Sequence, residues 1–150
     1  MSVKLPIIGE PGAPQYNVDA MKVAKISVGL ATTNDVVLTG LAETTALFAV
    51  EAGVFVHEVL ARVTTAFTAS AAITIGDTDV DGFLNAAYLG CTTASASVAR
   101  SSRTPLDSDT GVLAYARGRY YGSTDAINAV TGGTCAAGAM DVYVVYSRQV

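Results

Sequence analysis

The chain has 150 residues, of which 51% are hydrophobic and 15% are charged, with a formal net charge of −4 at pH 7. The 9 Lys and Arg residues are spread thinly, which argues against nucleic acid as a partner, because such binding depends on clustered positive charge at the phosphates. The mean hydropathy of +0.42 suggests apolar surface that another protein covers, although abundant Ala and Gly also raise this value.

A membrane does not explain this apolar composition. The most apolar stretch, residues 46–56, is interrupted by Glu51 and Gly53 and is shorter than the roughly 18–20 residues that a spanning helix needs. The N-terminal apolar run is broken by Pro6 and does not resemble a signal peptide. We therefore expect no membrane partner and a product that is made in the cytoplasm.

The first 21 residues differ from the rest of the chain. Pro6, Pro11 and Pro14 exclude a helix or a central strand there. Apolar residues are nevertheless interspersed, whereas a disordered tail is normally polar and charged. Residues 1–21 are therefore predicted to form an extended arm that docks on a partner, and a poorly ordered terminus is the alternative. The expected docking residues are Leu5, Pro6, Ile7, Ile8, Tyr16 and Val18.

From Lys22 onward, apolar residues recur with the period of two that indicates β-strands. The alternation is clear in residues 22–30, 58–67 and 140–146, and shorter strands are predicted at 36–41, 71–75 and 112–121. Only residues 82–89 could form a short helix, and a strand fits the same residues equally well. About eight strands separated by turn residues indicate one all-β domain over residues 22–150, an antiparallel two-sheet sandwich. A jelly roll is the specific expectation, and an immunoglobulin-like sandwich is the alternative.

The residue types needed for catalysis are scarce. His57 is the single histidine, and a lone histidine in a strand is more often structural than catalytic. No Gly-x-Ser-x-Gly motif or phosphate-binding loop is present. The two cysteines, Cys91 and Cys135, do not form a zinc or redox motif, and we expect both to be free and buried, with a single bridge as the alternative. We therefore expect no enzymatic activity and no cofactor.

One acidic segment calls for separate consideration. Asp77, Asp79 and Asp81 alternate before Gly82, as in the first half of an EF-hand calcium loop. The position that should supply a bidentate Glu is Tyr88, so the EF-hand interpretation fails. A different calcium site at Asp77, Asp79 and Asp81 remains a weak candidate, and a solvent-exposed acidic turn is the preferred interpretation.

Five tyrosines in the second half of the chain are candidate interface anchors, because Tyr is enriched at protein interfaces. Some of them must instead belong to the core. The five are Tyr115, Tyr120, Tyr121, Tyr143 and Tyr146.

The run ITIGDTDVDGFL, residues 73–84, resembles a phrase common in small structural proteins of tailed bacteriophages. The preceding strand, which ends Thr65-Ala66-Phe67, and the C-terminal residues 138–146 have the same style. The resemblance covers residues 54–90 and 135–147. Such proteins include capsid decoration, or cement, proteins, which commonly form trimers with β-sandwich or jelly-roll bodies and bind the outside of the capsid, often through an extended arm.

This resemblance implies a structural virion protein on the capsid surface, assembled in the host cytoplasm. Its implied partners are the major capsid protein and further copies of itself, most simply as a homotrimer. A phage head- or tail-fibre module and a carbohydrate-binding β-sandwich are the alternatives.

Overall fold

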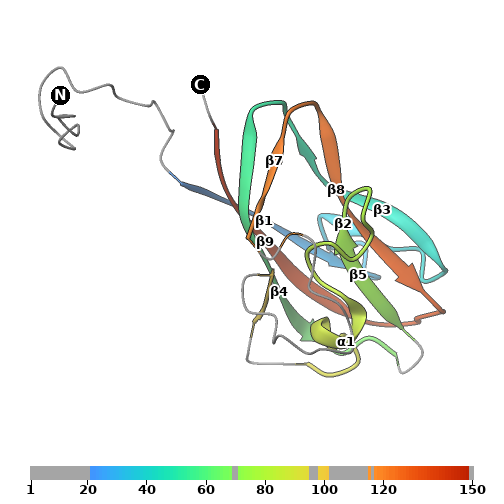
Figure 1. The fold of residues 1–150 in the computed structure, drawn as a ribbon. Helices are drawn as coiled ribbons and strands as arrows, with labels where there is room; N and C mark the ends of the chain where they lie inside the picture. The colour runs from blue at the N-terminus through green and yellow to red at the C-terminus, as the bar shows by residue number, and fades with distance from the viewer. Residues whose placement is uncertain (1–20, 69–70, 95–97, 102–114, 116, 149–150) are drawn as a thin grey trace, which may run out of the picture.

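The computed structural model describes residues 21–68, 71–94, 98–101, 115 and 117–148, which form two stacked β-sheets (Figure 1). Residues 1–20, which carry the expected docking residues of the arm, lie outside the described residues. The described strands and the single described helix are β1 (Lys22–Gly29), β2 (Val36–Val37), β3 (Glu43–Val50), β4 (Val54–Thr65), β5 (Ala72–Gly76), α1 (Ala86–Leu89), β6 (Ala99–Arg100), β7 (Arg119–Tyr121), β8 (Asp125–Gly132) and β9 (Ala139–Arg148).

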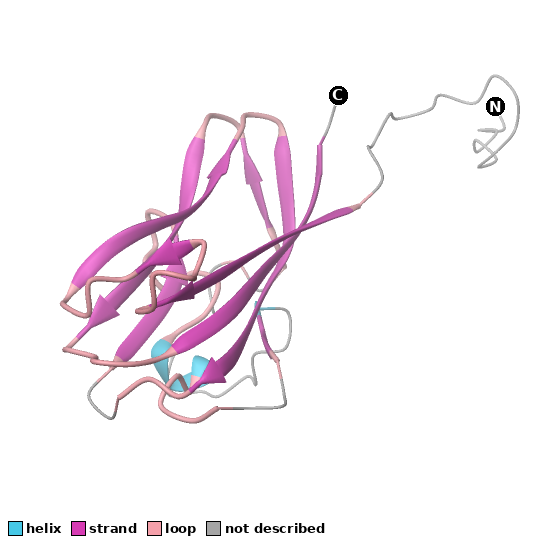
Figure 2. Cartoon of the chain, turned by 180° about the vertical axis from the view of Figure 1, so that it is seen from behind, coloured by secondary structure: helices cyan, strands magenta, loops and turns pink. Residues whose placement is uncertain are grey.

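The larger sheet has the strand order β2-β1-β9-β4-β6, and β7 also pairs with β4. The smaller sheet has the order β3-β8-β5. The pairings are antiparallel except for the short parallel contact between β1 and β2. Strands are the main regular structure in both views of the chain (Figures 1 and 2). The expected all-β, antiparallel two-sheet sandwich is confirmed.

The core lies between the sheets and is built by the alternation seen in the sequence. Inward positions of the larger sheet carry Val28, Val59 and Val142, and the facing positions of the smaller sheet include Ile73 and Ile127, all of them fully buried. Each such aliphatic side chain contributes about 1.5–3 kcal/mol on burial. The period-two pattern therefore fixes which side of each strand meets the other sheet.

Two predicted strands are shorter than expected. The strand predicted at 36–41 is limited to Val36–Val37. The strand predicted at 112–121 begins only at Arg119, because Gly118 has a φ of +87°, which is incompatible with an extended strand. Residues 112–114 and 116 lie outside the described residues. Of the helix and the strand that the sequence left open within residues 82–89, the structure has the helix, α1 at Ala86–Leu89.

Candidate interaction surface

The outer face of the larger sheet carries an apolar strip that crosses neighbouring strands. Val23 of β1 lies opposite Val145 of β9, and Tyr143 of β9 lies opposite Leu60 of β4. Val98, directly before β6, completes a shallow depression with these four side chains and Arg62. We call Val23, Leu60, Val98, Tyr143 and Val145 the outer patch. Val23 is 64% exposed and Val98 is 38% exposed, so the patch is open to solvent.

Folding of the isolated chain does not explain the outer patch. A sheet with one face on the core normally places polar residues on its other face. The outer face of the smaller sheet has fewer large apolar side chains, with Thr44 and Ala46 of β3 opposite Val130 and Asn128 of β8. The outer patch instead places four aliphatic side chains and a tyrosine ring at or next to outward positions of adjacent strands. A contiguous exposed apolar area of this kind is typical of a protein-binding surface.

The charged residues around the outer patch are paired within the chain. The carboxylate of Asp141, which is 8% exposed, contacts Lys25 Nζ at 3.2 Å and Arg62 Nη2 at 3.1 Å. The hydrogen bond to Asp141 raises the pKa of Lys25, whose ammonium also lies 5.5 Å from the centre of the Tyr143 ring. Arg100 Nε is 3.9 Å from a carboxylate oxygen of Glu58. A partner can therefore cover the patch without supplying a countercharge for each of these groups.

A second unusual feature is a buried carboxylate, that of Asp77, whose side chain is fully inaccessible to solvent. Its oxygens accept hydrogen bonds from the hydroxyls of Tyr115 and Tyr121, each at 2.8 Å, and from the backbone N–H of Asp79 at 3.1 Å. Arg119 Nε lies 2.7 Å from Oδ2 as an ion pair, although its N–H is not directed well enough to count as a hydrogen bond. Arg119 Nη1 also donates to the Tyr115 hydroxyl. We call Asp77, Tyr115, Arg119 and Tyr121 the Asp77 cluster.

The electrostatics of the Asp77 cluster favour the ionised carboxylate. Burial by itself raises the pKa of Asp77, but the hydrogen bonds from Tyr115, Tyr121 and Asp79 and the charge of Arg119 outweigh burial, so that the pKa lies below its usual value. Burial and the hydrogen bond to Asp77 raise the pKa of Tyr121. Tyr121 therefore stays a neutral hydrogen-bond donor at all ordinary pH values.

The preferred interpretation of the acidic segment as a solvent-exposed turn is wrong for Asp77, because its side chain is buried. Its partners Tyr115 and Tyr121 lie 38 and 44 positions further along the chain. Asp81 is exposed as expected, and its hydrogen bond to Asp79 raises the pKa of Asp79. Within the part of the chain that the structure describes, no three His, Cys, Asp or Glu side chains are grouped to hold a metal ion.

The other candidate residues have packing contacts. Cys91 and Cys135 are free and buried, as expected, and the Cys91 thiol donates to the carbonyl of Ala71 at 3.2 Å. His57 Nε2 lies 2.8 Å from the Ser147 hydroxyl, and its ring packs 4.8 Å from that of Phe55. Neither site brings together the groups that nucleophilic catalysis uses.

The five tyrosines divide between interior and surface. Tyr115 and Tyr121 belong to the Asp77 cluster, Tyr143 lies in the outer patch, and Tyr120 is 52% exposed on β7. Tyr146 faces an open groove between the sheets. The sequence reading named Tyr143 but missed Val23, Leu60, Val98 and Val145. The sequence signal that could have identified these residues is the presence of apolar side chains at outward positions of strands in which apolar and polar residues otherwise alternate.

Among the described helical residues, no segment has the length and apolar character required to cross a bilayer. An antiparallel sandwich with an exposed apolar sheet face is typical of proteins that bind other proteins.

The sequence and the fold of the chain can also be compared with those of known proteins. The sequence matches no protein-family model and no curated protein. A chain of the cyanophage Pam1 capsid asymmetric unit is similar with a TM-score of 0.57 and 18% identity, over 86% of this chain and 85% of that one. A chain of the acid-stable capsid of Helicobacter pylori bacteriophage KHP30 is similar with a TM-score of 0.54 and 14% identity, over 88% of this chain and 90% of that one. At these identities the shared property is the fold.

Proposed function

We propose that this chain is a structural virion protein that binds the outer surface of a phage capsid and stabilises the shell as a decoration, or cement, subunit. Its proposed partners are the major capsid protein and further copies of itself as a homotrimer. In this role it acts by binding alone and needs neither a cofactor nor a catalytic group.

The observation that carries the proposal is the extent of the fold similarity. Both similar chains come from phage capsid structures, and the match spans 85% and 90% of those chains as well as 86% and 88% of this one. The three chains are therefore of comparable length, and the shared unit is nearly the whole polypeptide. The similarity to two chains of phage capsids over nearly their whole length supports a structural role in a virion for this chain.

The strand order supports the jelly-roll class that we propose for the sandwich. β8 lies between β3 and β5, and β9 lies between β1 and β4. The C-terminal strands are thus inserted into the centres of both sheets, which requires the nested long connections of a double Greek key. An isolated antiparallel bridge between Ile75 and Leu84 extends the smaller sheet beyond β5.

The outer patch is the proposed contact with the shell. A subunit that binds the assembled shell but not its free components shifts the equilibrium towards assembly by mass action. On a symmetric lattice, several modest contacts add by avidity, so no single contact has to be strong. An apolar patch whose neighbouring charges are already paired in the chain suits such a contact.

The test uses the full-length protein and shells of the cognate major capsid protein assembled without it. We expect saturable co-sedimentation of the protein with the shells and a higher temperature of shell disassembly, measured by light scattering. Failure of the protein to co-sediment at any concentration, with intact shells and folded protein, contradicts the proposal. Binding to glycans or to tail preparations instead of shells supports the alternatives of a carbohydrate-binding or fibre module.

A further inference from the structure

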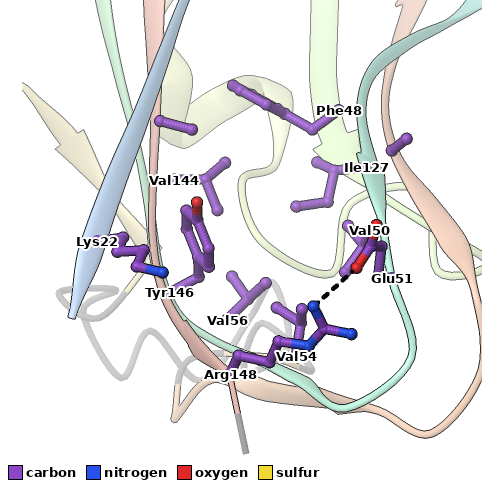
Figure 3. A pocket seen from close by; sticks show the side chains of 12 residues that line it. Lys22, Phe48, Val50, Glu51, Val54, Val56, Ile127, Val144, Tyr146 and Arg148 are labelled. Atoms are coloured by element: carbon purple, nitrogen blue, oxygen red, sulfur yellow. Dashed lines mark ion pairs between the residues drawn. The ribbon is translucent and has the colours of Figure 1, made fainter. Parts of the chain in front are cut away.

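The sandwich is open at the end where β1 begins and β9 ends. A groove of about 380 Å3 enters there between the two sheets. Its floor is apolar and includes Val54, Val56, Ile127 and Val144, with the rings of Phe48 and Tyr146 on either side. Figure 3 shows these side chains converging on a common space between strands of both sheets. This space lies on the inner side of the larger sheet and is separate from the outer patch.

Charged residues mark the mouth of the groove. Lys22, the first residue of β1, lies on one side, and Glu51, in the turn between β3 and β4, lies on the other. Arg148 at the end of β9 contacts the Glu51 carboxylate at 3.2 Å. Polar residues are therefore limited to the rim, and an occupant that enters between them meets an apolar interior.

The groove is flanked by strand edges that the described residues leave without a partner strand. β3 is an edge strand of the smaller sheet, and β1 pairs with β2 only at Val28 and Gly29. The Ser27 N–H, which points to the open edge of β1, is bonded instead by the Asp35 carboxylate at 2.7 Å. An open groove between two strand edges fits an extended peptide.

We propose that the groove binds the N-terminal segment of a second copy of this chain, through the apolar residues within positions 5–18. The 20 residues that precede Met21 lie outside the described part, and their sequence offers Leu5, Ile7, Ile8, Tyr16 and Val18 among prolines that favour an extended backbone. This segment enters the sandwich beside Lys22, at the mouth of the groove. The inference rests on the proposed assembling role and names the contact that joins the copies.

The geometry of β1 favours exchange between copies over docking within one copy. The first residues of β1 extend beyond the edge of the sandwich in both views (Figures 1 and 2). Docking in the chain's own groove would require the backbone to reverse before Met21, because β1 begins beyond the edge of the sandwich. An extended segment of 20 residues reaches roughly 66–72 Å, several times the radius of gyration of roughly 14 Å expected for a domain of this size. Such segment exchange is a low-barrier route to closed oligomers.

The direct test is photo-crosslinking of the full-length protein without any capsid. Glu51 is replaced by p-benzoylphenylalanine, and copies labelled with 15N are mixed with unlabelled copies, allowed to exchange and irradiated. We expect crosslinks that join position 51 of one isotope to a peptide within residues 1–20 of the other isotope. The same photoreactive residue at Thr44, on the outer face of β3, is the matched control and should not label residues 1–20.

A pair of full-length variants gives an independent measurement. Ala24→Phe adds a ring at a half-buried position that lines the groove, whereas Ala46→Phe adds the same ring to the exposed face of β3. We expect the solution mass to fall to that of a monomer for the first variant only, with both variants folded by circular dichroism. Crosslinks confined to a single copy, crosslinks that avoid residues 1–20, or no crosslinks at all would overturn the inference. An oligomer that persists in folded Ala24→Phe would overturn it as well, whereas failure of the wild-type protein to bind shells, with these crosslinks present, would instead count against the proposed function.

Discussion

The Asp77 cluster and the outer patch are two exceptions to the rule that charged residues are exposed and apolar residues are buried. In the first, a carboxylate is fully buried, and in the second, Val23 is 64% exposed. The difference lies in what surrounds each anomaly. The carboxylate of Asp77 is fully engaged by two tyrosine hydroxyls, a backbone N–H and Arg119. Val23, by contrast, has no covering layer within the described residues.

This contrast separates structural from functional irregularities. A buried charge that is completely paired stabilises one arrangement of the chain. Removing a single partner lowers the free energy of unfolding strongly, because the remaining groups stay buried without a partner. An exposed apolar side chain contributes little to the isolated fold, so its presence points to a partner outside the chain. Substitutions in the Asp77 cluster should therefore change stability, and substitutions in the outer patch should change attachment.

The largest expected effect is on stability. Asp77→Ala should lower the free energy of unfolding by about 3 kcal/mol, at the lower end for a broken buried pair, because Arg119 is 26% exposed and can regain some hydration. A loss of this size lowers Tm by roughly 10 °C in a domain of this length, measurable by calorimetry. Asp81→Ala, in the same turn but exposed, is the control and should leave Tm within about 2 °C. Equal effects of the two substitutions would contradict a structural role that is specific to Asp77.

The next effect is on attachment. Val23→Asp places a carboxylate in the outer patch, where covering by a partner would bury it without a pair, and affinity for the shell should fall about 100-fold, or about 2.7 kcal/mol. Thr44→Asp introduces the same residue on the outer face of β3, an edge strand of the smaller sheet, and should leave affinity unchanged. Co-sedimentation isotherms measure both, and Tm should move little in either variant. A similar loss for Thr44→Asp would show that attachment is not confined to the outer patch.

A smaller effect concerns one hydroxyl of the Asp77 cluster. Tyr121→Phe removes the 2.8 Å hydrogen bond to Asp77 Oδ2 but leaves the other donors, so we expect a loss of about 1–2 kcal/mol in unfolding free energy. Tyr120→Phe, at the adjacent and 52% exposed ring, should change it by less than about 0.5 kcal/mol. Chemical denaturation with urea distinguishes these values, and a neutral Tyr121→Phe would contradict the inferred network.

The smallest effect is a pH dependence. The pKa of Asp77 is lowered in the folded protein, so the ionised group contributes stability above its unfolded pKa of about 3.9 and loses it only as the pH falls through the lower folded value. The difference in Tm between the wild type and Asp77→Asn should therefore stay constant from about pH 7 to pH 5 and shrink below about pH 4. A difference that shrinks between about pH 7 and pH 5 would mean that the folded pKa is raised.

The sequence predicted the β-sandwich and the inward positions of its long strands, because strand alternation depends only on local geometry. Val28, Val59 and Val142 are buried as the period of two requires. The Asp77 cluster could not be predicted, since the partners of Asp77 are brought together by pairing of distant strands and by the turn before β7. The outward apolar residues were visible in the pattern, but their union into one patch depends on the order β1-β9-β4, which periodicity does not encode.

The central claim is that the outer face of the larger sheet binds a capsid exterior. A cryo-electron microscopy reconstruction of shells saturated with the full-length protein tests it most directly. We expect density for the sandwich on the outside of the shell, with Val23, Tyr143 and Val145 against the capsid and the β3 face towards solvent. Density in which the outer patch faces solvent, or shells without added density at saturating protein, would contradict the account.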